Sequence, residues 1–166
     1  MITEDYVSFE TAKLLKEKGF DEKCKYVWKL DKANDPNATD GISKICAERF
    51  MEGESSVDNS DIKSVFEYEG WLEDHHEAYL CPTLQMAMKW LRKAYDIHIN
   101  VFRYPAAFFN DNNEQCKPWW FQYTLLKPLN EIDIDSHMGD DEFESPEEAM
   151  DCAIKYCLKN LLGNEN

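Results

Sequence analysis

The chain has 166 residues, of which 33 are acidic and 18 basic, and its formal net charge at pH 7 is −15. Apolar residues make up 43% and aromatic residues 13% of the chain, which is enough for a folded core and excludes a disordered protein. The negative charge disfavours direct binding to nucleic acid and to anionic membranes, and no apolar run approaches the roughly 20 residues of a membrane span.

The N-terminal residues and the cysteines both predict a cytoplasmic protein. Residues 1–5, MITED, lack the basic and apolar regions of a signal peptide. The six cysteines include no Cys-x-x-Cys pair, so their spacing favours neither a zinc ribbon nor a thioredoxin-type site. We therefore expect reduced, partly buried thiols and no cofactor.

The first elements of the chain are a predicted helix and a predicted strand. Residues 8–18 have helical spacing of apolar side chains, with Ser8 as the capping residue and Gly19 just after the end. Residues 24–30 alternate between apolar and polar side chains, which is typical of a half-buried strand.

The next segment is the least regular part of the sequence. Residues 31–62 contain two clusters of turn-forming residues, which favour a surface insertion. Within it, residues 42–51 predict a short helix. After it, residues 65–69 predict a second strand.

The second half begins and ends with helices. Proline at the first helical position and apolar residues at helical spacing predict a helix over residues 82–95. Residues 96–104 and 119–126 predict an antiparallel hairpin with a long loop. A capping box that begins at Ser145 predicts a last helix, which ends before Gly163.

Together these elements predict a single α+β domain over residues 1–166. Its centre is expected to be a short antiparallel sheet of about four strands, with the helices packed mainly on one face.

Four segments resemble a family of small proteins encoded by phages, prophages and mobile elements of Bacteroides-type gut bacteria. They are residues 2–9 (ITEDYVSF), 14–21 (LLKEKGFD), 82–92 (PTLQMAMKWLR) and 156–161 (YCLKNL). These are mostly packing residues, and no activity is established for the family. The resemblance therefore implies a cytoplasmic accessory protein of a mobile element, without a mechanism.

One acidic stretch comes close to the pattern of a calcium loop. Acidic residues take positions 1, 3, 9 and 12 of such a loop: Asp133, Asp135, Asp141 and Glu144. The sharp-turn glycine falls one position late, at Gly139, and His137 stands where an oxygen ligand is needed. The pattern favours a solvated acidic connector over a metal site.

An aromatic cluster surrounds the predicted hairpin and is the candidate surface for a protein partner. Its members are Tyr104, Phe108, Phe109, Trp119 and Trp120. Adjacent residues of a strand face opposite sides, so one of the two tryptophans is expected to be exposed unless the hairpin loop covers it. Exposed aromatic side chains often mark an interaction surface.

The functional prediction is a non-catalytic accessory protein that binds another protein. The sequence has no nucleophile elbow, Walker loop or zinc-protease motif, although a small enzyme without a recognisable motif is an alternative. Another is an acidic inhibitor that imitates nucleic acid, because ten of the 21 residues at 131–151 are acidic.

Overall fold

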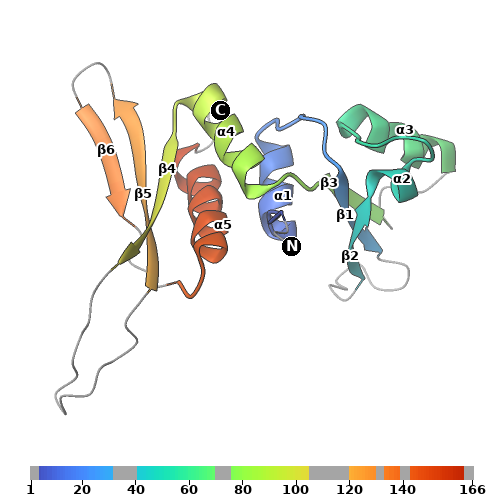
Figure 1. Cartoon of the computed structure of the whole chain (residues 1–166). Helices are drawn as coiled ribbons and strands as arrows, with labels where there is room; N and C mark the ends of the chain where they lie inside the picture. The colour runs from blue at the N-terminus through green and yellow to red at the C-terminus, as the bar shows by residue number, and fades with distance from the viewer. Residues whose placement is uncertain are drawn as a thin grey trace, which may run out of the picture. The chain divides into compact units, whose positions relative to one another are not determined.

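A computed structural model of the chain describes six stretches, which are residues 4–31, 41–69, 76–104, 120–129, 133–138 and 143–162. The chain divides into two compact units, Met1–Thr83 (unit 1) and Leu84–Asn166 (unit 2) (Figure 1). Two compact units can still unfold together, so the single domain stays a prediction.

Unit 1 contains three helices and a three-stranded sheet in its described residues. The elements in chain order are α1 (Phe9–Glu17), β1 (Tyr26–Asp31), β2 (Ile42–Cys46), α2 (Ala47–Phe50), α3 (Asn59–Glu69) and β3 (His76–Leu80). The strand order is β2-β1-β3, and both pairings are antiparallel.

The sheet of unit 1 is covered on both faces. Helix α1 lies on one side of it, and α2 and α3 lie on the other (Figure 1). Consecutive residues of a strand point to opposite faces, and Ala78, Tyr79 and Leu80 of β3 are all buried. The Trp28 indole also donates a hydrogen bond of 3.0 Å to the carbonyl oxygen of Val7, which holds the segment before α1 on the sheet.

Unit 2 has a second three-stranded antiparallel sheet, with the order β4-β5-β6. Its elements are α4 (Leu84–Tyr95), β4 (His98–Tyr104), β5 (Trp120–Leu129), β6 (Asp133–Met138), α5 (Pro146–Tyr156) and a π-helical turn (Cys157–Leu161). Helix α5 contacts β4 and β5, and α4 contacts α5 and β4. Both helices lie on one side of the sheet (Figure 1).

The capping signals in the sequence predicted the helix starts correctly. The Ser8 hydroxyl accepts a hydrogen bond from the backbone N–H of Thr11, and the Ser145 hydroxyl accepts one from Glu148. Gly19 follows α1 with a φ of +86°, a conformation that glycine adopts without a steric penalty. None of the helices within the described ranges combines the length and apolar character that a membrane span requires.

The α+β class is confirmed, but the prediction of one sheet of about four strands is wrong. The six described strands form two separate sheets of three strands each. The sequence analysis missed β3 and β6. In unit 1 the helices cover both faces of the sheet, whereas the prediction placed them mainly on one.

Two local predictions are also wrong. Residues 65–69, predicted as a strand, belong to helix α3. Residues 42–51, predicted as a short helix, form strand β2 followed by the single turn of α2. In both cases the segment is too short for the spacing of its apolar residues to distinguish a helix from a strand.

We expect the cysteines to react in two classes. The five described cysteines are thiols; Cys24, Cys81 and Cys157 are buried, whereas Cys46 and Cys152 are partly exposed. Burial raises the pKa of each of the three buried thiols to about 12. Because the thiolate is the reactive form, iodoacetamide at pH 8 should label Cys46 and Cys152 first.

The measurement is peptide mass spectrometry after timed alkylation, with urea-unfolded protein as the control in which all cysteines react. Labelling of the three buried thiols at the rate of the other two, in folded protein, would contradict the packing described here.

Candidate functional site

Strand β3 forms one edge of the unit 1 sheet. The backbone N–H of Cys81 donates a 2.9 Å hydrogen bond to the carbonyl oxygen of Tyr26, within the antiparallel register of β1 and β3. Backbone groups of an antiparallel strand alternate between its two edges, so Glu77 and Tyr79 turn theirs toward β1. Those of Ala78 and Leu80 point away from β1, but both residues are buried, at 2% and 3% exposed. Just past Leu80 the same edge is occupied by the segment before α1, since the Val7 N–H donates a 3.1 Å hydrogen bond to the Pro82 carbonyl oxygen.

A pocket of about 380 Å³ lies along this outer edge. Helix α1 contributes one lining residue, α3 four and β3 three: Lys16, Asn59, Ile62, Lys63, Phe66, Glu77, Ala78 and Tyr79. We call it the edge groove. It combines apolar and aromatic side chains with two lysines and one carboxylate.

The α1 side of the edge groove carries a cation. The Lys16 ammonium nitrogen lies 3.5 Å from the outward carbonyl oxygen of Ala78 and 5.1 Å from the centre of the Tyr79 ring. The Phe9 ring packs edge-on against Tyr79, with 5.4 Å between the ring centres. The contact with Ala78 is long for a hydrogen bond and therefore weak.

Tyr79 and Glu77 are held together on the same side. The Tyr79 hydroxyl donates a 2.7 Å hydrogen bond to a carboxylate oxygen of Glu77. Burial, and then this hydrogen bond, raise the pKa of the Tyr79 phenol. Tyr79 therefore stays a neutral hydrogen-bond donor at physiological pH. One oxygen of the Glu77 carboxylate is stabilised by the hydrogen bond from its hydroxyl.

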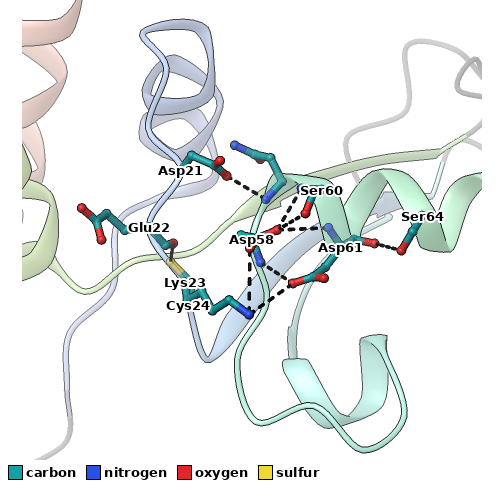
Figure 2. A network of polar contacts seen from close by, with 9 residues as sticks. Asp21, Glu22, Lys23, Cys24, Asp58, Ser60, Asp61 and Ser64 are labelled. Atoms are coloured by element: carbon teal, nitrogen blue, oxygen red, sulfur yellow. Dashed lines mark hydrogen bonds and ion pairs between the residues drawn. The ribbon is translucent and has the colours of Figure 1, made fainter.

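The α3 side of the groove is fixed by carboxylates at the start of that helix (Figure 2). One Asp58 oxygen accepts hydrogen bonds from the backbone N–H groups of Ser60 and Asp61, at 3.0 and 3.1 Å. Asp61 accepts the N–H of Asp58 in return, at 3.0 Å, and Asp21 accepts that of Asn59, at 2.9 Å. These bonds satisfy the first N–H groups of α3, as a helix start requires.

This capping arrangement determines what α3 shows to the groove. With its first turn anchored to Asp21, the helix lines the groove with Ile62, Lys63 and Phe66. The Lys63 ammonium lies 3.7 Å from a Glu67 carboxylate oxygen, and both side chains are about 70% exposed, so this ion pair is weak.

A second pocket of about 460 Å³ lies in unit 1, between the end of α2 and the middle of α3. Its lining residues are Phe50, Met51, Glu52, Ser64, Val65 and Tyr68. No strand contributes to this lining, and it contains no lysine.

The aromatic cluster predicted as a partner surface is only partly described. Tyr104 and Trp120 are opposite each other in the register of β4 and β5. Phe108, Phe109 and Trp119 lie outside the described residues. The cluster therefore stays a prediction.

The predicted calcium-loop residues do not all lie in a loop. Asp133 and Asp135 belong to strand β6, where Asp133 is opposite Leu129 of β5 and Asp135 is opposite Lys127. Glu144 precedes α5, and Asp141 lies outside the described residues. Within the described part of the chain, no three His, Cys, Asp or Glu side chains are grouped as a metal site would need.

The acidic segment 131–151 is divided between different elements. Its described part includes strand β6 and the first half of α5. In α5, the Asp151 carboxylate lies 3.9 Å from the Lys155 ammonium, one turn further along the helix. The acidic residues of this segment are therefore distributed over a strand and a helix.

No protein-family model matches the sequence, and no curated protein or solved structure matches it either.

Sequence reasoning missed the edge groove because it missed β3 and misassigned α3. Two signals in the sequence could have identified helix α3. Asp58 and Asp61 have the spacing of reciprocal caps, and Ile62, Val65 and Phe66 follow at helical spacing. What no local signal gives is the position of β3 at the sheet edge, because strand order depends on the whole unit.

The Asp58 cap should make the stability of unit 1 depend on pH. Hydrogen bonds from the Ser60 hydroxyl and then from the Asp61 N–H hold the pKa of the Asp58 carboxyl below its ordinary value. The charged form is therefore stabilised in the folded state. This stabilisation is present above the ordinary pKa and is lost as the pH falls through the lowered one.

The test is urea unfolding of wild type, Asp58→Asn and Asp58→Ala between pH 7 and pH 3. Asparagine keeps a capping oxygen, so Asp58→Asn should be the more stable variant at every pH. The difference between wild type and Asp58→Asn should shrink toward pH 3. A difference that stays constant would show that the Asp58 charge contributes nothing.

Proposed function

We propose that this chain is a non-catalytic interaction protein that binds an extended segment of another protein along the edge groove. The carrying observation is the pocket of about 380 Å³, whose lining combines apolar and aromatic side chains with two lysines. A pocket of mainly apolar lining with a few polar groups is the usual form of a binding site. The apolar lining would bury one or two side chains of the bound segment.

The chemistry of the groove suits binding. Tyr79 serves as a neutral donor to Glu77, and Lys16 lies over an aromatic ring and a carbonyl oxygen. These groups can recognise a backbone and its side chains without a bond being made or broken. We place this activity in the cytoplasm, where buried thiols stay reduced, and in an accessory role such as the resemblance to mobile-element proteins implies.

A peptide that binds in the edge groove should bind with modest affinity. Burial of one or two apolar side chains contributes about 1.5–3 kcal/mol each. With a few polar contacts, the dissociation constant of a short peptide should be about 10 μM to 1 mM. The probe is a labelled eight-residue peptide of alternating valine and threonine, followed by fluorescence anisotropy.

NMR chemical shifts, measured with and without peptide, locate the binding. The signals of Lys16, Phe66 and Tyr79 should shift, whereas that of Lys44 on β2, the opposite edge of the sheet, should not. Phe66→Ala should weaken binding, and the control Tyr68→Ala, in the second pocket of unit 1, should not. Binding that shifts only β2, or that Phe66→Ala leaves unchanged, would overturn the proposal.

A further inference from the structure

We propose that the second pocket of unit 1, between α2 and α3, binds a segment of a partner protein in which an apolar side chain is flanked by arginine. The pocket is separate from the edge groove, and this proposal does not depend on the function assigned to that groove. Its volume of about 460 Å³ lies within the range of about 300–1,000 Å³ that is typical of binding pockets.

An exposed tyrosine forms one side of this pocket. Among the side chains that the structure describes, Tyr68 is the single large hydrophobic one that is exposed, at 93%. It lines the pocket from the end of α3, one helical turn after Ser64. An exposed aromatic ring beside a pocket often marks an interaction surface, and the face of such a ring can receive a cation.

The apolar part of the lining is anchored in the core of the unit. Phe50 is only 8% exposed, and its ring packs edge-on against Phe66, with 6.3 Å between the ring centres. Met51 and Val65 line the pocket with it, and the flexible methionine side chain adapts to different contacts. These side chains provide a place for an apolar anchor next to the exposed ring.

A tight turn holds two acidic residues at the α2 end of the pocket. The Glu54 N–H donates a 3.2 Å hydrogen bond to the Met51 carbonyl oxygen, and Gly53 within this turn has a φ of +87°. Glycine adopts that conformation without a steric penalty. Glu52 lines the pocket, the turn keeps Glu54 close to Met51, and both glutamates are exposed.

The charge around the pocket stays negative after the ion pairs of the unit are taken into account. Residues 47–68 contain six acidic and two basic residues. Lys63 lies 3.7 Å from Glu67 and lines the edge groove, and Lys23 lies 3.9 and 4.0 Å from Asp58 and Asp61. The other charged residues of this segment are three glutamates and one arginine: Glu48, Glu52, Glu54 and Arg49. Even where that arginine neutralises one glutamate, two carboxylates remain to attract a cation.

These features fit arginine better than lysine or a second copy of the chain. A guanidinium group stacks on aromatic rings and forms two hydrogen bonds to one carboxylate, whereas an ammonium group is a point charge. Tyr68 and Glu52 line the same pocket, so an arginine there has a ring to stack on and a carboxylate to pair with. A second copy would add its own net charge of −15, which opposes self-association.

The test uses four labelled eight-residue peptides of serine with a central leucine, which is flanked by arginine, lysine, glutamine or glutamate. Binding is measured by fluorescence anisotropy at 50 and 300 mM NaCl. The proteins are wild type, Tyr68→Ala and Glu52→Gln. The matched control is Glu67→Gln, an exposed glutamate of α3 that does not line the pocket, and Lys16→Gln changes the edge groove alone. Thermal unfolding verifies that each variant is folded.

We expect the arginine peptide to bind wild type about three- to tenfold more tightly than the glutamine peptide at 50 mM NaCl, and this preference to shrink at 300 mM. Tyr68→Ala should weaken binding of the arginine peptide about three- to tenfold, because a stacking surface is lost. Glu52→Gln should reduce the preference for arginine, whereas Glu67→Gln and Lys16→Gln should behave as wild type.

Three results would overturn the proposal. The first is equal binding of the arginine and glutamine peptides by wild type, or no binding of either. The second is an equal loss in Glu52→Gln and Glu67→Gln, because the preference would then follow from the overall charge. The third is a wild-type dimer in sedimentation that Tyr68→Ala abolishes, which would identify a second copy as the occupant. None of these results bears on the edge groove, whose binding is tested with different peptides.

Discussion

Hydrogen-bonding capacity at the sheet edge is the constraint on which the candidate site depends. Strand β1 uses both of its edges, one for β2 and one for β3, so the outward groups of Ala78 and Leu80 need a different partner. Lys16 supplies one donor, and the burial of both residues shows that the edge is covered within the unit. An edge strand is a hazard unless something covers or charges it, and α1 with its lysine does both here.

The two helices beside β3 turn this edge into a groove. Helix α1 is held against the sheet by the aromatic contacts of Phe9 with Trp28 and Tyr79. Helix α3 is anchored by carboxylates that satisfy its own first N–H groups, so its N-terminus is not a site for an external anion. The groove is therefore formed by packing and capping.

Local chemistry made several elements predictable. Ser8 and Ser145 cap their helices as expected, because a capping hydroxyl acts within three residues of itself. The β4 and β5 hairpin was also predictable from alternation over two long runs. Strand β2 was not, because five residues with apolar positions at both ends fit a helix turn or a strand, and pairing with β1 decided between them.

The sequence by itself determined the α+β class, the capped helices, the excess of negative charge and the absence of familiar catalytic motifs. All of these are properties of composition or of neighbouring residues. The tertiary structure decided that the strands form two sheets, that β3 lies at an edge, and that Lys16 of α1 reaches Ala78, 62 positions away. Such contacts depend on strand order and on which faces the helices cover, and these follow from the joint burial of distant segments, which no local pattern encodes.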